Sequence, residues 1–207
     1  METLTYRRNK VYDPILRLIH AWNGLAILFL IATVMLSELF EKGVGEDTLW
    51  QFHIYLGYGL ILGLAARLAW GMVGPAHARF SDMWHPSSWW KAITTRNLQS
   101  VPRLGHDVLA SGVYLLVYLL LLTMAVTGLG LAAVEHSTGP FNTWFGDMAW
   151  LKETFEEPHE LIYNLLIGFV IVHIGALIWH EWKDSTPLAQ SMVTGYQYQI
   201  TKGDDHA

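Results

Sequence analysis

The sequence predicts an all-α integral membrane protein, a four-helix bundle with short interfacial helices in its loops. Hydrophobic residues make up 52% of the 207 residues, and the mean hydropathy is +0.27. These residues are gathered into four blocks, each long enough to cross a bilayer, which takes about 20 mostly apolar residues as a helix. Basic residues are concentrated on one side of the blocks. We therefore expect one transmembrane domain over residues 1–207.

The four expected spans cover about residues 15–37, 50–73, 108–134 and 161–179. Asp13 and Pro14 are expected to begin the first span, because Asp caps a helix N-terminus and Pro fits the first helical position. The first apolar block is longer than the hydrophobic region of a signal peptide, and no small-residue cleavage site follows it. We therefore expect it to remain as the first span.

Short helices are expected in two of the connections. Residues 71–103 form a long loop rich in tryptophan and basic residues. Within it, residues 86–91 (Pro-Ser-Ser-Trp-Trp-Lys) predict a capped helix at the level of the lipid headgroups, which tryptophan prefers. A Gly-Pro turn at 139–140 precedes a second short helix, expected over 143–155. Both ends of the chain are expected to be polar tails.

The distribution of charge predicts the orientation. Of the 13 Lys and Arg residues, only Lys42 and Lys152 lie on the side opposite the two termini. The positive-inside rule therefore places both termini in the cytoplasm. The opposite face is acidic, which argues against a nucleic-acid partner and would suit a basic external protein. Its carboxylates are Glu38, Glu41, Glu46, Asp47, Glu135, Asp147, Glu153, Glu156, Glu157 and Glu160.

Four histidines lie inside the expected spans, where an ionisable residue indicates a functional site because lipid does not solvate it. His159 and His173 are fourteen residues apart on the fourth span. This spacing is nearly four helical turns, so both rings project from one face, roughly 21 Å apart along the axis. By depth in the membrane, His159 pairs with His53 of the second span, near the outer surface. His173 pairs with His20 of the first span, nearer the inner surface.

Each pair offers two neutral imidazoles to one iron, an arrangement that leaves no open position for oxygen chemistry. The chain has no cysteine, which excludes iron–sulfur clusters held by thiolates and haem attached through Cys-x-x-Cys-His. The predicted cofactors are therefore two non-covalent haems b. His53 and His159 would bind the outer iron, and His20 and His173 the inner iron. The structural alternative is four isolated histidines, each satisfied by a backbone carbonyl or by water.

Other polar residues near the inner surface remain candidates for secondary roles. His180 lies two turns beyond His173 on the same face and would be the alternative inner ligand; otherwise it suits a solvated or propionate-binding role. His106 is expected to meet a propionate, a quinone or water. Arg67 would bind a haem propionate, or it would extend to the headgroups. The remaining histidines, expected to be loop or interfacial residues, are His77, His85, His136 and His206.

Glycines beside the histidines fit the same picture. Gly57 lies one turn after His53, and Gly24 lies one turn after His20. Gly128 lies towards the outer end of the third span. A flat porphyrin between helices needs backbone without side chains in its plane. Small residues also allow close packing of membrane helices without a cofactor.

The sequence resembles the bacterial cytochrome b561 group of four-helix, di-haem proteins, which includes the b-type cytochrome subunits of nickel–iron hydrogenases. The matching stretches are Tyr12-Asp-Pro-Ile-Leu-Arg-Leu-Ile-His20, Phe52-His-Ile-Tyr-Leu-Gly57, Arg67-Leu-Ala-Trp-Gly-Met-Val-Gly74 with Ala78-Arg-Phe-Ser-Asp82, and His159-Glu through His173. The resemblance implies the same four haem ligands. This group usually has Trp in place of Tyr12 and commonly His-Trp in place of His20-Ala-Trp22; neither departure removes a ligand.

The resemblance also implies a function. Electrons would pass between an external, periplasmic redox protein and the quinone of the bacterial inner membrane, with the chain as the electron-transfer subunit of an oxidoreductase complex in a respiratory chain. The partner would be a hydrogenase or a c-type cytochrome, and a homo-oligomer remains open. Two alternatives are a membrane anchor subunit without its own electron transfer and a stand-alone quinone-linked oxidoreductase.

Overall fold

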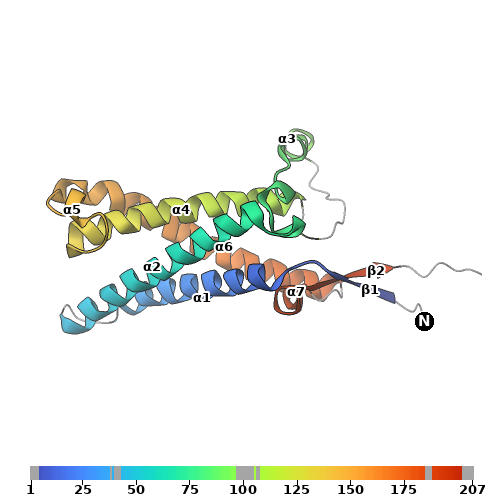
Figure 1. Ribbon diagram of the computed structural model, residues 1–207, viewed down its shortest axis with the longest axis horizontal. Helices are drawn as coiled ribbons and strands as arrows, with labels where there is room; N and C mark the ends of the chain where they lie inside the picture. Colours follow the sequence, from blue (N-terminus) through green and yellow to red (C-terminus); the bar gives the residue numbers. More distant parts are fainter. Residues whose placement is uncertain are drawn as a thin grey trace, which may run out of the picture. The chain divides into compact units, whose positions relative to one another are not determined.

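Four long helices dominate the computed structural model, which describes residues 5–37, 39, 43–96, 105, 108–184 and 188–201. They are α1 (Pro14–Ser37), α2 (Val44–Val73), α4 (Val108–His136) and α6 (Lys152–Asp184) (Figure 1). In the described part of the chain, four helices are long and apolar enough to cross a membrane. The predicted all-α membrane protein with four spans is confirmed.

Two helices extend at least five residues beyond one end of their expected spans. α2 begins six residues before the expected position, and α6 continues past both expected ends. Hydrophobicity marks the part of a helix that lies in lipid, whereas helical hydrogen bonding continues into polar sequence. Glu46 and Asp47 occupy the first turn of α2, where carboxylates interact favourably with the helix dipole. The cytoplasmic placement of both termini stays a prediction from the positive-inside rule.

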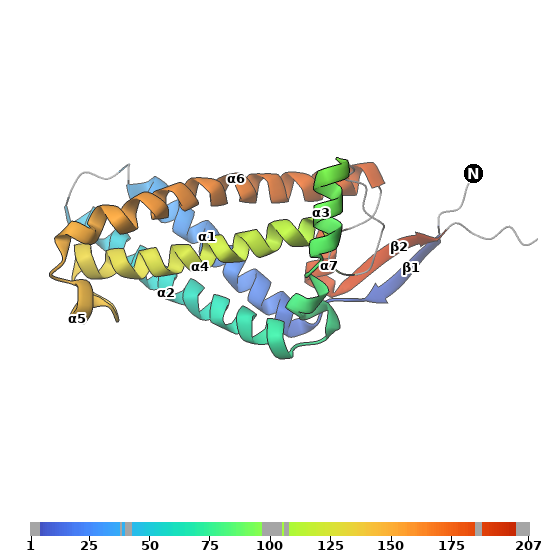
Figure 2. The same ribbon diagram turned by 90° about the horizontal axis from the view of Figure 1, so that it is seen from above.

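The prediction of one continuous helix over residues 143–155 is wrong, because the structure divides this segment into separate helical pieces. α5 (Asn142–Phe145) is followed by the 3₁₀ turn η3 (Ala149–Leu151), and α6 begins at Lys152. Gly146 and Asp147 between them have low helix propensity, and Met148 has non-helical backbone angles (φ −99°, ψ 61°). Figure 2 shows α5 in the connection between the ends of α4 and α6.

The expected helix in the long loop is present as α3 (Pro86–Thr95), with Pro86 at its start. It follows the 3₁₀ turns η1 (Ala76–Ala78) and η2 (Phe80–Asp82). The indole of Trp89 anchors α3 by donating a hydrogen bond of 2.7 Å to the carbonyl of Val108. Trp90 and Ile93, three residues apart, are exposed. An apolar face of this kind suits the headgroup layer.

The chain ends are not simple polar tails. β1 (Thr5–Lys10) and β2 (Tyr196–Thr201) form an antiparallel two-stranded sheet (Figure 1). The short helix α7 (Ala189–Thr194) precedes β2, and Gly195 between them has φ +85°, a conformation that favours glycine. Its carbonyl accepts hydrogen bonds from the backbone N–H groups of Val11 and Tyr12. The two ends, expected to be polar tails, thus also pair with each other as strands.

The start of α1 follows the sequence prediction. The Asp13 carboxylate accepts hydrogen bonds of 3.0 Å from the backbone N–H groups of Ile15 and Leu16. It also accepts one from the indole of Trp70. The Tyr12 hydroxyl donates to the carbonyl of Gly105 at 3.1 Å. Burial, with smaller contributions from Tyr114 and Asp82, raises the pKa of Tyr12 to about 12, so the phenol stays protonated and remains a donor.

The chain divides into two compact units. Unit 1 comprises Met1–His20, Leu68–Tyr114 and Ile171–Ala207, and unit 2 comprises Ala21–Arg67 and Leu115–Val170. The single domain expected over residues 1–207 stays a prediction. The core of unit 2 draws on all four long helices and comprises Ala26, Leu60, Leu64, Val117, Leu121, Ile162 and Leu166.

Within unit 2, α1 and α2 pack closely. The indole of Trp22 donates a hydrogen bond of 2.8 Å to the carbonyl of Gly59. A Cβ atom built on Gly63 would lie 1.9 Å from Oδ1 of Asn23, so this contact requires glycine. Large apolar side chains such as Leu62 face outwards, which suits contact with acyl chains.

Candidate functional site

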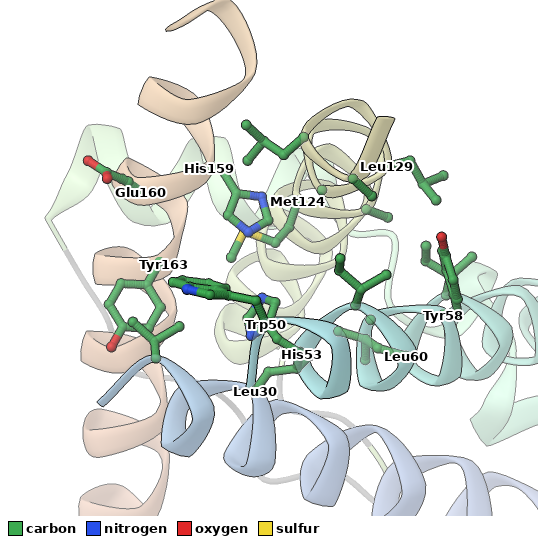
Figure 3. A pocket seen from close by; sticks show the side chains of 18 of the residues that line it. Leu30, Trp50, His53, Tyr58, Leu60, Met124, Leu129, His159, Glu160 and Tyr163 are labelled. Atoms are coloured by element: carbon green, nitrogen blue, oxygen red, sulfur yellow. The ribbon is translucent and has the colours of Figure 1, made fainter. Parts of the chain in front are cut away.

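Unit 2 contains a cavity of about 430 Å³, within the range of roughly 300–1,000 Å³ that small-molecule and cofactor sites occupy. Residues of α1, α2, α4 and α6 line it. His53 of α2 and His159 of α6 both lie on its wall (Figure 3). The structure therefore brings together the two histidines that the sequence assigns to the outer haem.

Each of these two histidines has a buried threonine beside it. The Nδ1 atom of His53 lies 2.8 Å from the hydroxyl of Thr33, on α1. The Nδ1 atom of His159 lies 3.0 Å from the hydroxyl of Thr127, on α4. Both threonines are buried, with 5% and 6% of their surface exposed. These contacts occupy Nδ1 of each ring and leave Nε2 as the nitrogen that can bind a metal.

The remaining cavity wall is mostly aromatic and aliphatic. The indole of Trp50 lies beside His53, with ring centroids 5.6 Å apart. Met124 and Tyr163 also line the cavity, and Figure 3 shows Met124 near His159. A methionine thioether is a second type of axial haem ligand, so Met124 is a residue of chemical interest that sequence reasoning missed. No regular spacing relates it to the histidines.

Glycines leave space on two sides of this cavity. A Cβ atom built on Gly57 would meet nothing within 4 Å, and Gly57 lines the cavity. A Cβ atom on Gly128 would lie 3.1 Å from Cε1 of His159. A side chain at the first position would project into the cavity, and one at the second would displace the imidazole. Both positions fit a flat group bound between the helices.

Unit 1 contains the second histidine pair. The rings of His20, on α1, and His173, on α6, have centroids 6.5 Å apart. When two imidazoles bind the same metal ion from opposite sides, through bonds of about 2 Å, their ring centres are roughly 6 Å apart. Tyr114 of α4 contacts His173 edge-on, with centroids 6.3 Å apart. His20 is exposed and His173 is partly buried. The spacing of this pair fits a shared metal.

The other candidate residues have different surroundings. His180 is exposed near the end of α6. His106 lies outside the described residues, as does His206. Arg67 is buried, with 3% exposed, and its Nε donates a hydrogen bond of 3.0 Å to the hydroxyl of Tyr118. This burial contradicts the alternative in which Arg67 extends to the headgroups.

The remaining histidines divide between loop and cavity. His77 and His85 lie in the loop after α2, as expected; Nδ1 of His77 is 3.5 Å from the Asp82 carboxylate, and Nε2 of His85 is 2.9 Å from the Asp82 carbonyl. His136, expected to be a loop or interfacial residue, is the exposed last residue of α4, and it also lines the cavity of unit 2. The helix continues two residues beyond the expected end, which places this histidine at the cavity.

Long apolar helices that bring histidines together in pairs are typical of membrane cytochromes. Residues 11–195 match the family model of the prokaryotic cytochrome b561. The chain belongs to this family of membrane b-type cytochromes.

Two relatives carry the name "Probable Ni/Fe-hydrogenase B-type cytochrome subunit". The protein from Azotobacter chroococcum mcd 1 is 27% identical over 162 residues, and that from Azotobacter vinelandii is 26% identical over the same length. Each match covers 70% of this chain but only 66% of the relative, so the chain matches just under two thirds of each relative's length. No solved structure matches the chain significantly.

Proposed function

We propose that this chain is a di-haem b-type cytochrome of the bacterial inner membrane, carrying electrons between an external redox protein and quinone. One observation carries the proposal: His20 pairs with His173 and His53 with His159, each pair inside one compact unit. Haem b is the cofactor of the family, and bis-imidazole ligation suits electron transfer because neither axial position is left open for a substrate.

The outer haem would be held in the cavity of unit 2. His53 and His159 would supply Nε2 to the iron, because their Nδ1 atoms face threonine hydroxyls. The aliphatic wall, including Leu30, would exclude water. Bound haem supplies one-electron chemistry between its ferric and ferrous states. The protein's part is to hold the imidazoles and to set the polarity around them.

The inner haem would be held by His20 and His173 in unit 1, whose ring spacing of 6.5 Å fits one metal between them. The fourteen-residue spacing of His159 and His173 along α6 is the sequence argument for two haems at different depths. His180 and His106 would contact a propionate or a quinone at the cytoplasmic surface.

Charge suggests the type of external partner. Carboxylates of Glu135, Glu156 and Glu160 line the cavity of unit 2, and Lys152 pairs with the first two. By the positive-inside rule, these carboxylates would lie on the periplasmic side. An acidic surface attracts a partner with a basic face and accelerates encounter. The two Azotobacter relatives are named as hydrogenase subunits. A hydrogenase is therefore the first partner to test here, and a c-type cytochrome is the second.

The proposal is tested on the purified full chain in detergent or nanodiscs. We expect two haems per chain, a reduced-minus-oxidised spectrum with the α-band of low-spin haem b, and reduction of haem by a short-chain quinol. One haem per chain would overturn the di-haem proposal. A chain without haem after gentle extraction would favour a membrane anchor. Catalytic turnover by the isolated chain, without an added partner, would favour a stand-alone oxidoreductase.

Filling the cavity at Gly57 should prevent binding of the outer haem. Gly57→Leu places a branched side chain into space that is open in the structure, so the haem content should fall from two to about one per chain. Gly168→Leu is the matched control, because Gly168 on α6 is also open within 4 Å but does not line the cavity. Pyridine haemochromogen assays measure both variants. Equal haem contents in the two would contradict this location of the site.

A further inference from the structure

We infer that Thr33 and Thr127 are positioning residues, which fix the tautomer of the two outer histidines and lower the reduction potential of the outer haem. The inference rests on the proposed function, because it concerns the haem that His53 and His159 would hold. It adds two residues that carry no metal-binding group themselves. The argument begins with the direction of each hydrogen bond.

The hydroxyl of Thr33 has a single hydrogen to donate. It lies 2.7 Å from the backbone carbonyl of Leu30, which only accepts, so that hydrogen is used there. We therefore assign the contact of 2.8 Å with His53 the opposite direction, with Nδ1–H donating to the threonine oxygen. This assigns the proton of neutral His53 to Nδ1 and leaves the lone pair of Nε2 for a metal.

Thr127 repeats the arrangement on another helix. Its hydroxyl lies 3.0 Å from the carbonyl of Thr123 and 3.1 Å from that of Met124, so its hydrogen is also directed at the helix backbone. Nδ1–H of His159 therefore donates to this oxygen over 3.0 Å. Both outer histidines therefore have the same sequence of hydrogen bonds, in which the imidazole donates to a threonine hydroxyl and the hydroxyl donates to a backbone carbonyl.

Thr33 and Thr127 differ from threonines that bond only to the backbone of their own helix. Threonine hydroxyls in membrane helices commonly bond to their own backbone, and Thr123, one turn before Thr127, does so while exposed. Thr33 and Thr127 are instead buried. They lie on α1 and α4, the two long helices that would supply no ligand to the outer haem. Each is thus aimed at a ring of a neighbouring helix.

A hydrogen bond from Nδ1–H makes the imidazole a stronger electron donor through Nε2, and a stronger donor favours ferric iron over ferrous iron. Removing the hydroxyl should therefore raise the reduction potential. Loss of such an outer-shell partner typically costs about 10–100-fold in metal affinity. We expect a change of about tenfold in the ferric-to-ferrous preference for each threonine, which corresponds to about 59 mV for one electron.

The test compares Thr33→Val and Thr127→Val, which keep the shape and remove the hydroxyl, with Thr33→Ser and Thr127→Ser, which restore it. Thr123→Val is the matched control on α4. Purified, haem-loaded full chains are titrated potentiometrically, and the ferric low-spin EPR signals are recorded. The valine variants should raise the potential of one haem and shift its EPR g-values, while the serine variants and Thr123→Val should match the wild type.

The inner haem serves as an internal standard for folding, because its potential should stay unchanged in every variant. If a valine variant instead loses the outer haem and keeps the inner one, while the corresponding serine variant holds both haems, that result also supports the inference. Two unchanged potentials with unchanged EPR signals would overturn it. A wild-type chain with fewer than two haems would instead contradict the proposed function, so the two failures are distinguishable.

Discussion

Replacing His53 by alanine should remove the outer haem while the inner haem remains. The imidazole of His53 lies on the cavity wall, and a haem iron left with one axial histidine is bound more weakly. Haem content should therefore fall from two to about one per chain, and the α-band amplitude should fall by about half. His159→Ala should give the same result, because both variants remove one ligand of the same iron.

His136→Ala is the matched control for these two variants, since His136 lines the same cavity and is not assigned to the iron. It should keep both haems. Adding imidazole to a His53→Gly variant should restore the outer haem, because free imidazole replaces a missing ligand but not a missing packing contact. If both haems persist in His53→Ala while Met124→Leu loses one, the thioether of Met124 is the ligand and the assignment of His53 is wrong.

The spans were predictable because hydrophobicity reports directly on what lipid accepts. The start of α1 was predictable as well, since Asp13 and Pro14 act locally, and the carboxylate makes the two capping hydrogen bonds expected of it. The pairing of β1 with β2 was not. It joins residues nearly two hundred positions apart, such as Thr5 and Thr201, and no local pattern in either strand marks its distant partner.

The histidines and the threonines of the outer site differ in how much the sequence reveals. An imidazole in an apolar span indicates a functional site because lipid does not solvate it, so His53 and His159 can be identified from the sequence alone. A threonine in a span does not indicate a site, because its hydroxyl can donate a hydrogen bond to a carbonyl in the preceding turn of its own helix. Thr127 and Thr123 are indistinguishable by that criterion. Only the packing of α4 against α6 shows that one of them meets His159.

The inner ligand is decided by comparing two variants of α6. His173→Ala should remove the inner haem, because the ring of His173 is 6.5 Å from that of His20. His180→Ala should keep it, since His180 lies seven residues further along the helix, about 10.5 Å in axial rise, and is exposed. Haem counting and redox titration of the full chain measure both outcomes.

The His20→Ala variant completes this comparison, because the inner iron would share its two ligands between α1 and α6. Its spectrum and haem content should match those of His173→Ala, with the outer haem retained in both. A His180→Ala variant that loses one haem, beside a His173→Ala variant that keeps two, would move the inner ligand two turns along α6. The ring pair of His20 and His173 would then be a packing contact, and the inner haem would need a different partner for His180.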